Sequence, residues 1–425
     1  MPLHTSSRIF LTGALAHLAL AGGLLAFTAY TGVLGARWDA FLWLLLMGFL
    51  AFSTLGFALH LFPAVARRPL HPRTGDLVMA GVAETGTLLG FIALSGLLPA
   101  TFAATGFALA AGLLTVTFLV ISLRFAGAFR TPPVAGAGPP ARPADFSTIP
   151  LFLSSWVAAA GAGLLFTFSA FQTGPGFGWW IAGVHLFVLG HVVLLIGAVS
   201  LRMVPRSLAA DPPPFATGLM TVTGPLGAIL VPAGMLIPSS DPEGLLSLLA
   251  IPEMIFAVTF LVILVDLAGR AKTPRPQAVL HVAAAAFFIG GGTVALWMLS
   301  TGRFTQIPVH AMLGLLGFFG LTILLMWFGM IAPFQRVSHQ WTKRMLWTLS
   351  AVLISGVAGF ALSGGAGGPA FRGAAEALGA LLVGLALVWA VGTLPVLFPS
   401  LNPLLGLNQD RIREIRTRWS EAHKR

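Results

Sequence analysis

Twelve stretches of this chain are each apolar over about twenty residues or more, the length that an α-helix needs to cross a lipid bilayer. Only 9% of the residues are charged and 57% are hydrophobic, whereas a soluble domain averages about 25% charged residues. The sequence therefore predicts an all-α, multi-pass membrane protein without a sizeable soluble domain. The expected spans are residues 9–33, 39–64, 77–98, 102–124, 149–172, 179–203, 216–238, 244–268, 277–300, 307–332, 345–365 and 373–398.

The 24 lysines and arginines are distributed unevenly between the two sides of these spans. With the N-terminus inside, the outer loops hold only Arg37, Arg303 and Arg372, and the other 21 lie in the tails, the remaining loops or the adjoining helix ends. Positive residues concentrate on the cytoplasmic side of a membrane. The prediction is thus an inner (cytoplasmic) membrane protein with both termini inside. The net charge of +11 has the same explanation, so the expected partner is the lipid bilayer and not nucleic acid.

Two polar breaks cut the chain into three blocks of four spans. The expected organisation is a first four-helix unit at 1–129, a Pro- and Ala-rich linker at 130–147, a second unit at 148–269, a linker at 270–276, a third unit at 277–400 and a basic cytoplasmic tail at 401–425. The tail fits either a short helix on the membrane surface or a solvated basic segment.

The second span of each block has a similar sequence. Each places a glycine in the middle of a long apolar run, with a proline fifteen or sixteen residues later and an arginine beyond it. The three glycine–proline pairs are Gly48 and Pro63, Gly190 and Pro205, and Gly317 and Pro333. This pattern predicts one helix used three times, with the rest of the chain arranged around it.

Histidines at membrane depth are costly and mark candidate sites. His185 and His310 are expected near the outer side of the membrane, on the second spans of the second and third blocks. A neutral imidazole is a good ligand for haem iron and for copper, so this pair is a candidate cofactor site. The alternative is a hydrogen bond to a neighbouring helix. We favour that alternative for the other four histidines within the spans, which are His17, His60, His191 and His281.

Three further observations bear on the chemistry. Met312 adds a thioether beside His310, but residues i and i+2 of a helix point about 200° apart, so the two face different sides. Glu84 and Glu253 lie within the apolar zone and are candidates for a proton path, with a structural hydrogen bond as the alternative. The chain has no cysteine, which excludes disulfides, iron–sulfur clusters, thiolate metal sites and covalently attached c-type haem.

Twelve helices in three blocks of four resemble subunit I of the haem–copper oxidase and nitric oxide reductase superfamily. The segment from Trp179 to His185 is similar to that family's sixth helix, which carries a copper-ligand histidine. The segment from His310 to Gly317 is similar to its tenth helix, which carries haem-ligand histidines. Histidines entering apolar helices also resemble the NnrS family of haem- and copper-binding membrane proteins. The resemblance implies haem bound by His310, copper bound by His185, and a cytochrome or other respiratory subunit as partner.

The sequence also departs from that family. Trp43 occupies the place of a haem-ligand histidine on the second span, Met312 replaces a second histidine on the tenth, and residues 216–238 lack the paired copper histidines. The only tyrosine, Tyr30, lies on the first span. The chain therefore resembles a haem- or metal-binding relative that has lost oxygen reduction. A cofactor-free proton- or ion-coupled transporter and a non-catalytic subunit of a respiratory complex are the alternatives.

Overall fold

The computed structural model describes residues 5–66, 68, 70, 74–130, 143–171, 178–208, 211–270, 276–331, 339–363 and 368–397. Every regular element in these residues is a helix. Within these residues, twelve helical spans are long and apolar enough to cross a membrane, so the predicted all-α polytopic architecture is confirmed. Most of the two predicted linkers and the whole predicted tail lie outside the described residues.

Nine spans are peripheral and three are central. The peripheral spans are α1 (Thr5–Thr31), α4 (Thr74–Leu94), α5 (Ala100–Ala128), α6 (Pro143–Ser169), α9 (Pro214–Leu236), α10 (Pro242–Leu249) continued by α11 (Ile251–Arg270), α12 (Pro276–Thr301), α16 (His339–Leu362) and α17 (Pro369–Leu397).

The central helices are composite, since each joins α-helical and π-helical segments. The first central helix is α2 (Leu34–Trp43), η1 (Leu44–Leu50) and α3 (Ala51–Ala66). The second is α7 (Gly178–His185), η2 (Leu186–Val193) and α8 (Leu194–Leu208). The third is a 3₁₀ turn η3 (Phe304–Gln306), α13 (Ile307–Met312), η4 (Leu313–Gly320), α14 (Leu321–Leu325) and η5 (Met326–Ile331).

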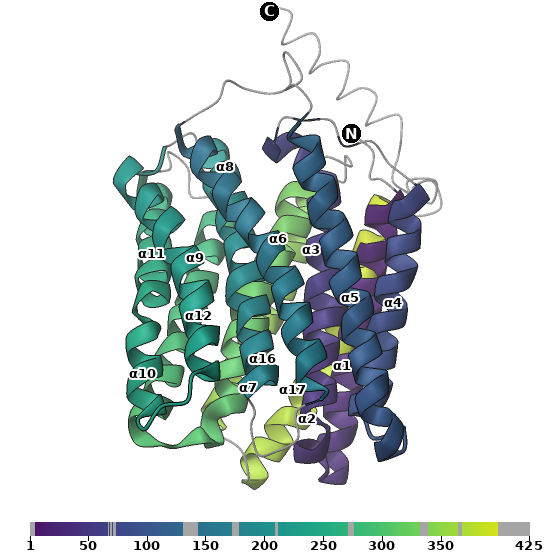
Figure 1. Ribbon diagram of the computed structural model, residues 1–425. Helices are drawn as coiled ribbons and strands as arrows, with labels where there is room; N and C mark the ends of the chain where they lie inside the picture. The colour runs from purple at the N-terminus through teal and green to yellow at the C-terminus, as the bar shows by residue number, and fades with distance from the viewer. Residues whose placement is uncertain are drawn as a thin grey trace, which may run out of the picture.

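Burial identifies these three helices as the centre of the bundle. In the most apolar part of each span, 100% of the residues are buried in the first central helix, 78% in the second and 83% in the third, against 28–50% in the peripheral spans. A helix that is apolar on every face is expected inside other helices or lipid. Figure 1 shows the helices running nearly parallel. The second span of each block is thus the helix that the other spans surround.

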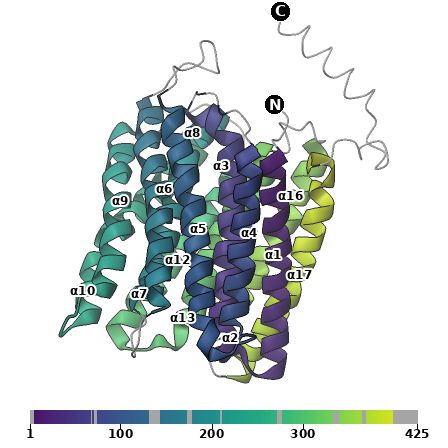
Figure 2. The ribbon, with the colours of Figure 1, turned by 45° about the vertical axis from the view of Figure 1, so that its right-hand side comes forward.

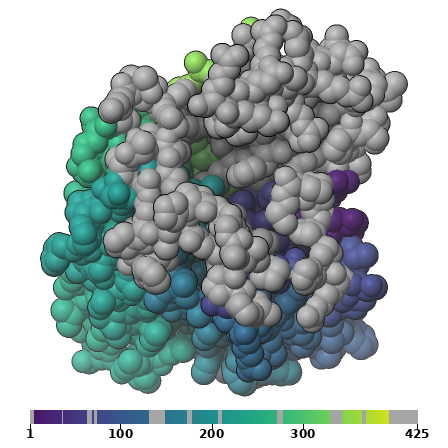
Figure 3. Space-filling model, turned by 90° about the horizontal axis from the view of Figure 1, so that it is seen from above, coloured from purple at the N-terminus to yellow at the C-terminus, as the bar shows by residue number. Residues whose placement is uncertain are grey.

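The peripheral helices follow one another around the centre in chain order. α5 packs against α6, α11 packs against α12, and α17 returns to pack against α1. In Figure 2 the first and last helices, purple and yellow, lie side by side. Gly22 and Gly379 bring their backbones together, because a Cβ on Gly22 would lie 2.7 Å from the Gly379 carbonyl oxygen. Seen from above, the purple-to-blue, teal and green parts of the chain succeed one another around the molecule (Figure 3).

The π-helical segments occur at equivalent places in the three central helices. Gly48 is the fifth residue of η1, Gly190 the fifth of η2, and Gly317 the fifth of η4. π-Helical turns are rare and usually occur singly inside α-helices. Their recurrence at the glycines that define the sequence pattern supports one helix design used three times.

The same glycines receive side chains from the first helix of their own block. A Cβ on Gly48 would lie 2.5 Å from His17 of α1, and one on Gly190 would lie 2.6 Å from Ala158 of α6. A Cβ on Gly317 would lie 2.7 Å from Phe287 of α12. The repeated glycine therefore serves close packing between the first and second helix of each block.

A buried ion pair joins α4 to α5 near the end at which α4 begins. The Arg124 guanidinium donates to the Asp76 carboxylate, and both side chains are at least nine-tenths buried. Pairing makes two charges tolerable at a buried position. The charge distribution of the sequence predicts that this end faces the cytoplasm, and we call the opposite end the outer end.

Candidate functional site

His185 is the last residue of α7, at the outer end of the second central helix. Its Nδ1 lies 2.9 Å from the carbonyl oxygen of Ile181, one turn earlier on the same helix. A carbonyl oxygen only accepts, so Nδ1 carries the hydrogen and donates it. The Nε2 atom of a neutral His185 is consequently unprotonated, the form in which imidazole binds a metal.

His310 repeats this arrangement on the third central helix. It lies on α13, which begins with Pro308 in its first turn, where a proline costs no hydrogen bond. Its Nδ1 donates to the carbonyl oxygen of Gly291 on α12 over 2.8 Å. The bond fixes the ring from a neighbouring helix and again leaves Nε2 as an acceptor.

The two imidazoles lie beside each other. Their ring centres are 6.2 Å apart and their planes differ by 14°. Neither Nε2 has a hydrogen-bond partner among the residues that the structure describes. We call His185 and His310 the outer imidazole pair. The sequence placed both at one depth, and the structure brings them together.

The spacing of the outer imidazole pair limits what it can hold. Two bonds of about 2.0–2.1 Å from nitrogen to one metal ion fit between rings at this distance. The donors therefore fit a single haem iron or a single metal ion.

The donor set is also small. Within the described residues, no group of three or more histidine or carboxylate side chains is placed to hold a metal ion. The inner histidines His17, His60 and His281 thus form no three-ligand site. Met312 is fully buried and follows His310 by two residues, so it points away from the pair.

On the first central helix, a packed tryptophan, Trp43, stands at the position that corresponds to His185. Trp43 directly precedes η1, as His185 precedes η2 and Met312 precedes η4. The Trp43 indole Nε1 donates to the Thr87 carbonyl over 2.9 Å, and its ring lies 6.1 Å from that of Trp180. A tryptophan with its hydrogen bond made and its ring buried is a structural residue.

Glu253 resembles the outer imidazole pair because it also has polar atoms without a hydrogen-bond partner among the described residues. It stands in the first turn of α11 and is 6% exposed, and neither carboxylate oxygen has a hydrogen-bond partner among the described residues. A Cβ on Gly227 of α9 would lie 2.7 Å from its Oε2. The next residue, Met254, contacts Gly292 of α12, which adjoins the carbonyl that holds His310. Glu253 and the pair are therefore linked through α12.

His191, by contrast, is fully satisfied. Its Nδ1 donates to the Ser155 carbonyl over 3.0 Å, and the Thr54 hydroxyl lies 3.0 Å from its Nε2. It joins η2 to α6 and to the first central helix. The prediction that this histidine makes structural hydrogen bonds is confirmed.

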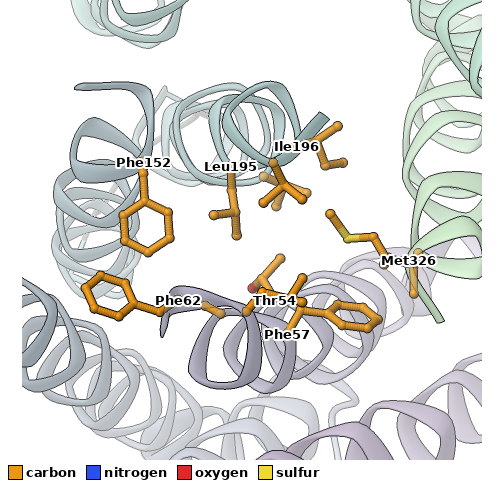
Figure 4. A pocket seen from close by; sticks show the side chains of 12 residues that line it. Thr54, Phe57, Phe62, Phe152, Leu195, Ile196 and Met326 are labelled. Carbon is orange, nitrogen blue, oxygen red and sulfur yellow. The ribbon is translucent and has the colours of Figure 1, made fainter. Parts of the chain in front are cut away.

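A small cavity lies where the central helices meet, on the side of His191 that is away from the outer end. Figure 4 shows its lining, in which Thr54 is the one polar residue. The lining residues are Thr54, Phe57, Ala58, Leu61, Phe62, Phe152, Val192, Leu195, Ile196, Val199, Ile323 and Met326. Such a lining offers no donor set for a metal ion or a proton chain.

Comparison with known proteins does not assign the chain to a family. No protein-family model matches the sequence, and no curated protein is significantly similar to it. The candidate site is therefore argued from its own geometry. Sequence reasoning missed the carbonyl of Gly291, which positions His310, and the contact of His17 with Glu84, whose Nε2 and Oε1 atoms are 3.4 Å apart. Neither has a sequence signal, because backbone acceptors and pairings between distant helices follow from packing.

Proposed function

We propose that this protein is a membrane-embedded haem- or metal-binding protein that holds one redox-active centre, a haem iron or a copper ion, between His185 and His310. The observation that carries the proposal is the pair of unprotonated Nε2 atoms on two central helices, with ring centres 6.2 Å apart. Imidazole suits both iron and copper. The bound centre would supply one-electron redox chemistry, while the chain fixes its two ligands through the carbonyls of Ile181 and Gly291.

The resemblance to the haem–copper oxidase and nitric oxide reductase superfamily supports this proposal from the sequence. A reduced ligand set supports a protein without oxygen reductase activity, since a copper site of that kind needs about three nitrogen ligands. Turnover of oxygen by the purified protein with a reduced electron donor would contradict this part of the proposal.

An absorption spectrum combined with metal analysis of the purified protein tests the site. A bound haem gives a Soret band, and copper without haem gives metal in the elemental analysis without that band. His185→Ala and His310→Ala are each expected to abolish or shift the signal. His60→Ala and His281→Ala, which remove buried histidines outside the pair, are the matched controls. Loss of the signal in the controls and its retention in the pair variants would refute the assignment.

A proton- or ion-coupled transporter is a second candidate, and Glu253 is the observation that favours it. A carboxyl group buried at membrane depth without a partner is costly and is kept mainly where protons or ions bind. In vesicles with an imposed pH gradient, Glu253→Gln would then abolish proton flux, while the exposed Glu376→Gln would leave it unchanged. Equal flux in both variants would remove this candidate.

A further inference from the structure

A second polar pair lies in the first block, away from the outer imidazole pair. His17 is the thirteenth of 27 residues in α1, and Glu84 is the eleventh of 21 in α4. Both therefore stand near the middle of a membrane-spanning helix. His17 Nε2 lies 3.4 Å from Glu84 Oε1, and the side chains are 1% and 42% exposed. The histidine is enclosed, whereas the glutamate reaches the surface of the bundle between α1 and α4.

The hydrogen bonds of His17 define where a proton can reside. Nδ1 donates to the Gly13 carbonyl over 2.8 Å, so Nε2 of the neutral ring is an acceptor. That Nε2 is buried, and it has no hydrogen-bond partner among the described residues. Among the described residues, the charged side chain that lies beside it is Glu84. A buried acceptor that lies beside a carboxyl group can receive a hydrogen bond from the protonated acid.

The backbone leaves room for this pair. A Cβ on Gly48 would lie 2.5 Å from the His17 side chain, and one on Gly13 would lie 3.7 Å from Glu84 Oε2. In the other two blocks, Ala158 and Phe287 occupy the place of His17 against the repeated glycine. The polar pair is thus specific to the first block and is not a requirement of the repeated packing.

Other charged groups on the helices that pack against α1 and α4 are distant or already paired. Asp76 lies eight residues before Glu84, about 12 Å along α4, and is paired with Arg124 of α5. On the first central helix, His60 is twelve residues beyond Gly48, about 18 Å along the helix. The remaining groups stand within the first eight residues at the outer ends of α2 and α17, and are Arg37, Asp39, Arg372 and Glu376.

We propose that His17 and Glu84 bind a single proton between them at the middle of the membrane. The proton resides on the Glu84 carboxyl group, which donates to His17 Nε2, because the neutral pair avoids placing two charges at membrane depth. This site is separate from the outer imidazole pair and requires no metal or haem.

Infrared spectroscopy of the full-length protein in lipid vesicles tests the site directly. The wild-type protein is expected to show a carbonyl band of a protonated carboxyl group at neutral pH that disappears in Glu84→Gln. Glu253→Gln removes a different band and serves as the control. His17→Leu and His17→Gln are expected to shift the Glu84 band, because the imidazole acceptor is lost. A spectrum unchanged by Glu84→Gln, or a Glu84 band unmoved by both His17 variants, overturns the proposal.

Labelling with a hydrophobic carbodiimide gives an independent readout. The reagent takes the proton of a carboxylic acid on one nitrogen while the carboxylate oxygen bonds to its central carbon. The resulting O-acylisourea then rearranges to a stable N-acylurea without losing an atom. Mass spectrometry is expected to find this adduct on Glu84 at neutral pH and several-fold less on Glu253, whose carboxylate is enclosed. An unlabelled Glu84 would show that it is ionised and would overturn the proposal.

Discussion

His185 and His191 lie six residues apart on the second central helix, yet their side chains have different surroundings. Both nitrogen atoms of His191 have partners, Ser155 on α6 and Thr54 on the first central helix. His185 has one partner, a carbonyl of its own helix, and a second imidazole 6.2 Å away. The deeper histidine joins three helices, whereas the outer one keeps an acceptor nitrogen that has no partner among the described residues and lies beside a second such imidazole.

The difference separates two kinds of polar group inside this bundle. Trp43, His191 and the Asp76–Arg124 pair are bonded to protein atoms of neighbouring helices and hold helices together. The outer imidazole pair and Glu253 retain polar atoms without protein partners. Groups of the first kind should affect stability when they are removed, and groups of the second kind should affect binding or proton transfer.

Asp76→Ala is expected to have the largest effect, lowering the free energy of unfolding by about 3–5 kcal/mol, because Arg124 loses its buried counter-charge. Denaturation in mixed detergent micelles measures the change. Asp266→Ala is the control, since Asp266 pairs with Arg270 one turn away at an exposed position. There the expected loss is at most about 0.5 kcal/mol. Equal losses would show that burial does not distinguish the two ion pairs.

His191→Leu is expected to cost about 1–3 kcal/mol, because it leaves the Ser155 carbonyl and the Thr54 hydroxyl without this partner in a buried position. The metal or haem content of the folded protein should not change. Unfolding and metal analysis on the same preparation measure both quantities. A variant of normal stability that lost its metal would reverse the roles assigned to His185 and His191.

Glu253→Met is expected to raise the free energy of unfolding by about 1 kcal/mol, since it removes a buried carboxyl group that lacks a partner. Glu376→Met, at an exposed position, should leave stability unchanged. A large destabilisation by Glu253→Met would mean that its carboxyl group makes a stabilising contact. Glu253 would then belong with the polar groups that hold helices together.

His185→Leu is expected to change the free energy of unfolding least, by no more than about 0.5 kcal/mol, in the protein purified without metal or haem. It should nevertheless abolish binding at the outer imidazole pair. A thermal unfolding series with and without added copper or haem separates the two effects. Stabilisation by the added ligand in the wild type, and none in the variant, is the expected pattern.

Much of the fold followed from the sequence because membrane spans are defined by length and apolarity. The spacing from Gly48 to Pro63, and its two counterparts, also identified which helices would be central. The spacing worked because a helix surrounded by other helices needs small residues where neighbours approach. Depth along the spans placed His185 and His310 at the same level.

The remaining features depend on neighbours that are distant in the sequence. The choice of Gly291 as acceptor for His310, the contact of His17 with Glu84, and the enclosure of Glu253 by Gly227 each involve two helices. In each case, rotation of either helix by a fraction of a turn would change the contact, and apolar runs carry no information on rotation. The π-helical turns, which set that rotation, also have no composition of their own.

Because of those π-helical turns, the directions of the His185 and His310 side chains depend on how many residues each turn of the helix contains. A π turn bonds each residue to one five positions away instead of four, so it accommodates one extra residue. One residue corresponds to about 100° around an α-helix. If η2 or η4 wound as regular α-helix with the same residues, His185 or His310 would turn by roughly a quarter of a circle relative to the other half of its helix. The amino-acid composition would be the same, yet the two imidazoles would no longer lie beside each other.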